Sequence, residues 1–151
     1  MRVLAIGDVC GKLGTEYLLK KLSFIKSKYN IDVVTHIMVG LPGETQNDLK
    51  NTVDFINSHN IKGLKIHSCY VVKNTVLADI FYNGQYLPIS LNYYLDSVIY
   101  ILTHINPNII IHRISGDAPK DLLIAPDWNN HKKWVLNNVH KNNHINKKSK
   151  T

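Results

Sequence analysis

The strongest constraint on the fold is a regular alternation of strand-like and helix-like segments along the chain. Residues Ile31–Val39 form an apolar stretch with almost no polar interruption, which is typical of a strand covered on both faces. A glycine-rich turn follows, and then Leu49, Val53 and Ile56 recur at helical spacing. Because parallel strands need helical crossovers between them, this order predicts an α/β fold.

The full pattern predicts about four largely parallel strands alternating with helices, as in part of a (β/α) barrel. The predicted strands are Arg2–Ile6, Ile31–Val39, Leu64–Val72 and Ile109–Ile114. Two of the predicted helices are Thr15–Tyr29 and Trp128–His140. A third follows the Gly40–Glu44 turn and begins with a capping box of Thr45 and Asp48, and a fourth begins after its capping residue Ser90. Strand alternation places Lys65, His67, Cys69 and Val71 on one face. Residues 73–89 are predicted to be irregular and the tail from Lys141 onward to be disordered.

Length and cysteine content exclude several classes of protein. At 151 residues the chain has room for one ordinary domain. Its two cysteines, Cys10 and Cys69, exclude a disulfide framework and any cysteine-rich metal cluster. Every apolar run is too short to cross a bilayer, and no secretory signal opens the chain. We therefore expect a cytoplasmic protein with no membrane partner.

The positive charge is concentrated at the C-terminal end. Residues 128–151 contain six lysines and no acidic residue, whereas the rest of the chain is nearly balanced. Such a tail is typical of a solvated extension. A contact with RNA through the same lysines is the alternative.

Two turns that follow predicted strands are candidate sites. Asp8 ends the first strand, where a carboxylate is either a metal ligand or a turn residue. The turn of Gly40, Leu41, Pro42, Gly43 and Glu44 either brings the backbone close to a ligand or simply connects a strand to a helix. It lacks the Gly-Lys-Ser/Thr ending of a P-loop, so nucleotide hydrolysis is not indicated.

A set of polar residues on the later strands is the third candidate. Lys65 and His67 share one strand face, Arg113 lies near the end of the last strand, and Asp117 follows it. A parallel barrel gathers such strand ends around one pocket, which these side chains would line. The alternative is a solvated lysine and a hydrogen-bonded core histidine.

The first 34 residues, MRVLAIGDVCGKLGTEYLLKKLSFIKSKYNIDVV, resemble the start of the calcineurin-like dimetal phosphodiesterases that act on cyclic nucleotides. In that family the Gly-Asp-Val-x-Gly turn places its Asp on the metal pair, and Asp8 matches that position. The Gly-Glu-Asn motif that should follow Val34 does not appear. One matched ligand does not hold two metal ions, so the resemblance implies no carried-over hydrolysis.

Residues 35–139 resemble the C-terminal part of a radical SAM protein, in the bacterial subgroup similar to the catalytic subunit of Elongator. The matching stretches are THIMVGLPGET, LKIHSCYVVKNTVLADIFYNGQY and HRISGDAPKDLLIAPDWNNHKKWVLN. The resemblance implies that the parent family uses S-adenosylmethionine and a [4Fe–4S] cluster. It implies a cofactor-proximal turn at Gly40–Glu44, with Lys65, His67, Arg113 and Asp117 as further cofactor-binding candidates around the cavity.

The cluster-binding motif of that family, Cys-x3-Cys-x2-Cys, does not occur in this chain, and Cys10 and Cys69 do not replace it. The sequence therefore predicts three parts: a phosphodiesterase-like start (1–34), the C-terminal portion of a radical SAM partial barrel (35–139) and a basic tail (140–151). The predicted function is a fragment or fusion that does not catalyse alone and binds no cofactor stably. The alternatives are a phosphodiesterase remnant with Asp8 as a single orphaned metal ligand, and a basic RNA-binding module.

Overall fold

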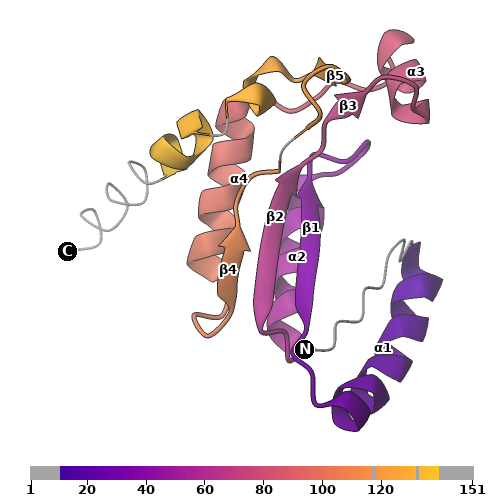
Figure 1. Cartoon of the computed structure of the whole chain (residues 1–151), viewed down its shortest axis with the longest axis vertical. Helices are drawn as coiled ribbons and strands as arrows, with labels where there is room; N and C mark the ends of the chain where they lie inside the picture. The colour runs from indigo at the N-terminus through magenta and orange to yellow at the C-terminus, as the bar shows by residue number, and fades with distance from the viewer. Residues whose placement is uncertain (1–10, 117, 132, 140–151) are drawn as a thin grey trace. The chain divides into compact units, whose positions relative to one another are not determined.

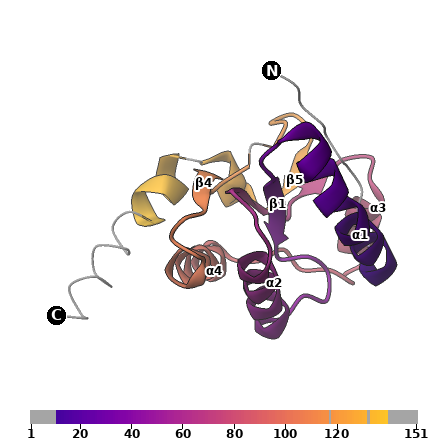
Figure 2. The same cartoon turned by 90° about the horizontal axis from the view of Figure 1, so that it is seen from below.

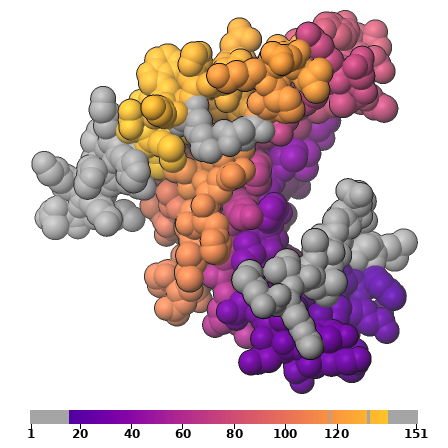
Figure 3. Space-filling model, in the orientation of Figure 1, coloured from indigo at the N-terminus to yellow at the C-terminus, as the bar shows by residue number. Residues whose placement is uncertain are grey.

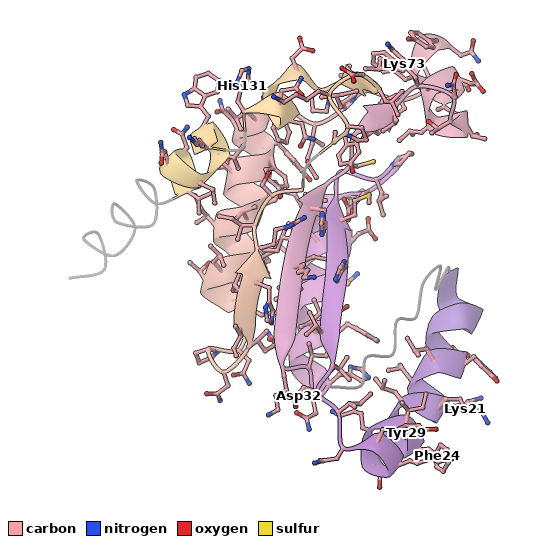
Figure 4. The ribbon with its side chains drawn as sticks, in the orientation of Figure 1. Lys21, Phe24, Tyr29, Asp32, Lys73 and His131 are labelled. Carbon is pink, nitrogen blue, oxygen red and sulfur yellow. The ribbon has the colours of Figure 1, made fainter. Side chains whose placement is uncertain are left out.

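The computed structural model describes residues 11–116, 118–131 and 133–139, which belong to two units, Met1–Val33 and Val34–Thr151. The first predicted strand, the basic tail, Asp8 and Asp117 lie outside the described residues. In the first unit the described element is α1 (Gly11–Tyr29), which includes the predicted helix. Lys28 lies over two of its exposed aromatic rings, with Nζ 5.4 Å from the ring centroids of Phe24 and Tyr29. Figure 4 labels both rings.

The second unit is built on a parallel sheet of three strands in the order β1 (Val34–Val39), β2 (Gly63–Ser68) and β4 (Ile110–Arg113). The helix α2 (Gln46–Ser58) connects β1 to β2, and α4 (Leu91–His104) lies between β2 and β4 in the chain. Both helices cover the same face of the sheet (Figures 1 and 2). Successive crossovers of one hand, in one direction along a sheet, produce this arrangement. The predicted α/β fold with parallel strands is confirmed.

Burial of the covered face explains why these segments form a core. On β2, Leu64 and Ile66 point toward the helices and are fully buried. The predicted stripe of Leu49, Val53 and Ile56 on α2 is also buried. Along α4 the buried positions recur at helical spacing, and they are Tyr94, Leu95, Ser97, Val98 and Ile101.

The starts of α2 and α4 follow the predicted capping pattern. Thr45 accepts a hydrogen bond from the Asp48 N–H, and Asp48 accepts one from the Thr45 N–H at 2.8 Å, which makes a complete capping box. Ser90 caps α4 by accepting from the Tyr93 N–H at 3.2 Å. The Asn57 side chain then joins the two helices, because it donates to the His104 carbonyl and accepts from the Asn106 N–H, both at 2.8 Å.

A second, smaller layer lies beyond the carboxyl edge of the sheet. It contains β3 (Val71–Val72) paired antiparallel with β5 (Leu123–Ala125), together with α3 (Val76–Tyr82) and the short η1 helix (Asp127–Asn130). Residues 133–139 are also helical. The side chains of Cys69, Val71, Ala78 and Tyr86 form the buried cluster of this layer. At this end Lys73 Nζ donates to the Asp121 carbonyl at 3.0 Å (Figure 4).

Three details of the sequence prediction are wrong. The strand predicted over Leu64–Val72 is two strands in two sheets, because β2 ends at Ser68 and the chain turns before β3. Cys69 and Val71 are therefore buried in the small layer and do not continue the face of Lys65 and His67. The irregular segment 73–89 contains α3, and the predicted helix from Trp128 is η1 followed by a separate helix at 133–139. In the described part of the chain, no helix is long and apolar enough to span a membrane.

Candidate functional site at the carboxyl edge of the sheet

The turn after β1 is held closed by its own glutamate. The Glu44 carboxylate accepts hydrogen bonds from the backbone N–H groups of Gly40 and Leu41, the second at 3.1 Å. The backbone N–H of Glu44 donates to the Leu41 carbonyl at 3.0 Å. Gly40 is buried with a φ of 88°, a conformation that L side chains rarely adopt. Leu41, Pro42 and Gly43 are exposed at the tip, where their backbone is accessible.

A buried tyrosine and a buried cysteine support this turn. The Tyr86 hydroxyl donates to the Gly40 carbonyl at 2.7 Å, and the Cys69 N–H donates to the Val39 carbonyl at 2.8 Å. Burial raises the pKa of the Cys69 thiol, and burial also raises the pKa of the Tyr86 hydroxyl. Both groups are therefore neutral near pH 7. Cys69 is a packing residue with no thiolate to offer a metal.

His67 lies near the same edge of the sheet, opposite Met38 in the register of β1 and β2. Its ring stacks on that of His36, with 5.5 Å between the ring centroids. A Cβ placed on Gly116 would lie 2.6 Å from His67 Nδ1, so the chain after β4 passes directly against this ring. His67 thus joins the sheet to the segment that precedes Asp117.

A buried polar pair lies beside the turn. Ser68 is opposite Val39, the residue before Gly40, and its hydroxyl donates to the Asn129 side-chain oxygen at 2.7 Å. Asn129 is 3% exposed, and its side-chain NH2 has no hydrogen-bond partner among the described residues. A buried donor of this kind is costly unless a water or a ligand accepts from it.

The η1 helix brings Asn129 into position. Its neighbour Trp128 stacks on Tyr94 of α4, with 5.2 Å between the ring centroids, and donates to the Ile89 carbonyl at 3.1 Å. The Tyr94 hydroxyl in turn donates to the Ile114 carbonyl at 2.8 Å. These contacts fix η1 to α4 and to the end of β4. Ser68 and Asn129 could not be predicted from the sequence, because only the tertiary contact brings these positions, 61 residues apart, together.

Lys65 and Arg113 lie further from the edge, on the sheet face that the helices do not cover. We call this the open face, and it carries His36, Met38, Lys65, His67 and Arg113. Lys65 is opposite His36 on one side and opposite Arg113 on the other. No helix of the second unit lies in front of this face in the space-filling view (Figure 3).

The predicted site residues therefore fall into two groups. The Gly40–Glu44 turn and His67 lie at the carboxyl edge, where β1 and β2 end opposite each other at Val39 and Ser68. Lys65 and Arg113 form a pair in the middle of the open face. Asp8 and Asp117 lie outside the described residues. Among the residues that are described, no group of three or more His, Cys, Asp or Glu side chains is arranged to hold a metal ion.

Two surface hollows lie away from these residues. One of about 710 Å³ is lined by Asn130, His131, Lys133, Trp134 and Asn137, near the labelled His131 (Figure 4). The other, of about 230 Å³, is lined by residues of α2 and α4, on the covered side of the sheet. Neither contains a predicted site residue.

Comparison with known proteins places the second unit in a family. The family model of the Radical_SAM C-terminal domain matches residues 61–144. The uncharacterised protein MJ0486 of Methanocaldococcus jannaschii is 31% identical over 74% of this chain and 35% of its own length. Protein YtqA of Bacillus subtilis is 33% identical over 76% of this chain and 35% of its own length. The chain thus spans about a third of the length of these relatives.

A solved structure has the same fold. The archaeal Elp3 of Methanocaldococcus infernus, with an N-terminal deletion, superposes with a TM-score of 0.61 at 18% identity, over 78% of this chain and 28% of the other. The Elongator complex protein 3 of Saccharomyces cerevisiae is 30% identical over 62% of this chain and 17% of its own length. Since the family match covers more than half of the residues, the chain belongs to the Radical_SAM C-terminal domain family.

Proposed function

We propose that this chain supplies the wall of a radical SAM reaction cavity at the carboxyl edge of its sheet, and that its own residues run no radical reaction. The observation that carries the proposal is the buried Asn129 amide, which has no partner for its NH2 among the described residues and is bonded to Ser68, opposite the last residue of β1 before the Gly40–Glu44 turn. In α/β folds, ligands bind where parallel strands end. A buried donor with no described partner beside an accessible backbone turn is the arrangement that a bound ligand completes.

The two cofactors of the family differ in how well they fit this chain. A [4Fe–4S] cluster needs clustered thiolates, whereas the sequence has two cysteines and Cys69 is buried with a raised pKa. The cluster does not fit, so no step is assigned through it. S-adenosylmethionine fits better, because the exposed backbone of Pro42 and Gly43 and the Asn129 amide offer hydrogen-bonding groups to its adenosyl part. In the family, S-adenosylmethionine supplies radical chemistry when a reduced cluster binds it.

Calorimetric titration of the full chain with S-adenosylmethionine tests the proposal. Without a cluster to hold the amino-acid end, we expect a Kd on the order of 1 mM, equivalent to about 4 kcal/mol. Gly40→Ala should abolish this binding, because its Cβ would lie 2.8 Å from the Ile89 side chain and push the turn outward. Gly84→Ala is the matched control, since Gly84 also has a positive φ but has open space around it.

A second pair of variants separates ligand contact from local stability. Asn129→Ala and Ser68→Ala both remove the hydrogen bond between these side chains, but only the first removes the buried NH2 group. Loss of binding in Asn129→Ala alone supports a direct contact with the ligand. Equal loss in both variants contradicts it. Micromolar binding by the unmodified chain would contradict the expectation that S-adenosylmethionine binds only weakly without a cluster.

Anaerobic reconstitution with iron and sulfide tests the other half of the proposal. We expect no stoichiometric cluster absorbance from this chain, since two cysteines do not supply three clustered thiolates. One cluster per chain, with the charge-transfer absorbance of [4Fe–4S], would show that the chain holds its own cofactor.

We also propose the three parts that the sequence predicts: a phosphodiesterase-like start over 1–34, a radical SAM portion over 35–139 and a basic tail over 140–151. The resemblance of the start to dimetal phosphodiesterases supports the first boundary. Hydrolysis of a cyclic dinucleotide by metal-loaded protein, abolished by Asp8→Ala, would show that the start carries activity of its own. We expect no hydrolysis, because one matched ligand does not hold a metal pair.

A further inference from the structure

Three side chains that carry or accept positive charge form a straight row across the sheet. Lys65 of β2 is directly opposite His36 of β1, and it is also directly opposite Arg113 of β4. Neighbouring strands are about 4.8 Å apart, so the row spans about 10 Å. It thus crosses every strand of the parallel sheet at one level.

An irregularity in the register makes the row possible. Between Leu64 and Lys65 the pairing with β4 skips one residue, so that Ile111 is opposite Leu64 but Arg113 is opposite Lys65. Strict alternation from Ile111 would have placed Arg113 on the face covered by the helices. The extra residue, His112, extends its ring over Gly63, where a Cβ would lie 2.5 Å from His112 Nε2. The shift therefore adds Arg113 to the open face, beside His112.

The open face carries no compensating acid on its own strands. The sequences of β1, β2 and β4 contain no aspartate or glutamate. The pKa of His36 is lowered, first because partial burial disfavours the charged ring and then because of the charges of Lys65 and Arg113. Like charges directly opposite each other in a sheet are destabilising. A fold that keeps such a row on one sheet face despite this cost is typical of a functional site.

The chemistry of the row fits an oxyanion. The Arg113 guanidinium offers a planar fork of donors that matches a phosphate, and the Lys65 ammonium adds a compact charge beside it. His36 is exposed and lies within the same electrostatic field. The flanking side chains on this face, Val34, Met38 and Ile110, are apolar and exposed, so the charged row stands in an apolar surround.

We propose that the His36–Lys65–Arg113 row binds the phosphate group of a small phosphorylated ligand. The inference rests on the proposed function, which assigns this part of the chain to the wall of a reaction cavity. It adds that the substrate of that cavity carries a phosphate ester. The row attracts the anion by charge, and the Arg113 fork orients it. Binding of the anion also removes the repulsion between Lys65 and Arg113.

Titration of the full chain with inorganic pyrophosphate at low salt, followed by calorimetry, is the direct test. Lys65→Met and Arg113→Ala should each weaken binding by about tenfold or more, as expected for loss of a charged hydrogen bond. Arg113→Lys keeps the charge but loses the fork, so its affinity should fall between those of the unmodified chain and Arg113→Ala. The matched control is Lys50→Met, which removes the same charge from an exposed position on α2.

The outcomes separate this proposal from its alternatives. If Lys50→Met weakens binding as much as Lys65→Met, or if pyrophosphate does not bind, the row is not an anion site. Comparison of inorganic phosphate with AMP identifies the source of the phosphate: tighter binding of AMP shows that a nucleoside part also contacts the face, and equal binding assigns the site to the phosphate alone. Pyrophosphate binding without any S-adenosylmethionine binding would overturn the proposed function and leave this inference intact.

Two further measurements test the row independently of the effect of the variants on binding. Because Lys65→Met keeps the side-chain stem and removes a repulsive charge, we expect no loss in the free energy of unfolding. In the unmodified chain, pyrophosphate should raise the pKa of the His36 ring, measured by NMR, since an anion favours the charged imidazole. An unchanged His36 titration at saturating pyrophosphate would place the anion elsewhere and overturn the proposal.

Discussion

The hydroxyl of Tyr86 donates a 2.7 Å hydrogen bond to the backbone carbonyl of Gly40, so a residue between α3 and α4 supports the turn that follows β1. The two residues are 46 positions apart. Both are buried, and Tyr86 belongs to the apolar cluster of the small layer. The position of the candidate turn therefore depends on the packing of that layer against the sheet edge.

Tyr86→Phe should lower the free energy of unfolding by about 1–3 kcal/mol, because it leaves the buried Gly40 carbonyl without its donor. Urea denaturation followed by circular dichroism measures the change. Tyr82→Phe is the matched control, since Tyr82 is 69% exposed, and its effect should stay within about 0.5 kcal/mol. Equal effects of the two variants would show that the hydrogen bond does not hold the turn.

Leu64→Ala should lower the free energy of unfolding by about 2–5 kcal/mol, because Leu64 is fully buried between β2 and the helices and its loss leaves a cavity. Leu87→Ala makes the same chemical change at a side chain that is 85% exposed, and it should cost less than about 0.5 kcal/mol. Urea midpoints of the two variants test the assignment of the covered face. A Leu87 variant as unstable as the Leu64 variant would contradict it.

Asp48→Asn should destabilise the chain at pH 7, and its effect should shrink as the pH falls through the lowered pKa of Asp48 in the folded chain. The hydrogen bonds from the Thr45 hydroxyl, at 2.6 Å, and from the Thr45 N–H lower the pKa of Asp48 in the folded chain. The stabilisation is therefore present above the unfolded pKa of about 4 and is lost as the pH falls through the lower folded value. Urea unfolding across this range measures it, with Asp54→Asn on the same helix as control.

The unfolding free energy should fall as the pH drops below about 6.5, with His36 as one contributor. Its folded pKa is lowered, so the unfolded chain binds more protons and acid favours unfolding. The charged groups that face it are Lys65 and Arg113, and the His67 ring stacks on it. Lys65→Met should raise the NMR-measured pKa of His36. A His36 pKa that does not respond to Lys65→Met would show that burial alone causes the shift.

Much of the fold was predictable from local patterns. The stripe of Leu49, Val53 and Ile56 predicts α2 and its buried face, and the Thr45–Asp48 capping box predicts where that helix begins. The order of strands and helices predicts the parallel pairing, because a helical crossover joins strands that run the same way. The glycine-rich turn at Gly40–Glu44 was also predictable, because its glycines and proline are neighbours in the sequence.

The candidate site needed tertiary structure. Regular alternation along Leu64–Val72 predicts one strand, whereas the chain leaves the sheet after Ser68 and buries Cys69 in a second layer. Asn129 was missed because a side chain 61 residues away completes its hydrogen bond. The residues next to a position in the sequence do not indicate which distant side chain it contacts in the fold.

By itself, the sequence determined that strands alternate with helices through β1, α2, β2, α4 and β4, where α2 and α4 begin and which helical stripe of α2 is buried. Only the tertiary structure decided that Arg113 lies opposite Lys65. The physical reason is that helical periodicity and caps act between residues a few positions apart, whereas strand register is set by pairing between distant segments. A single skipped residue in β4 changes which side chain lies on the open face, and that change creates the charged row with His36.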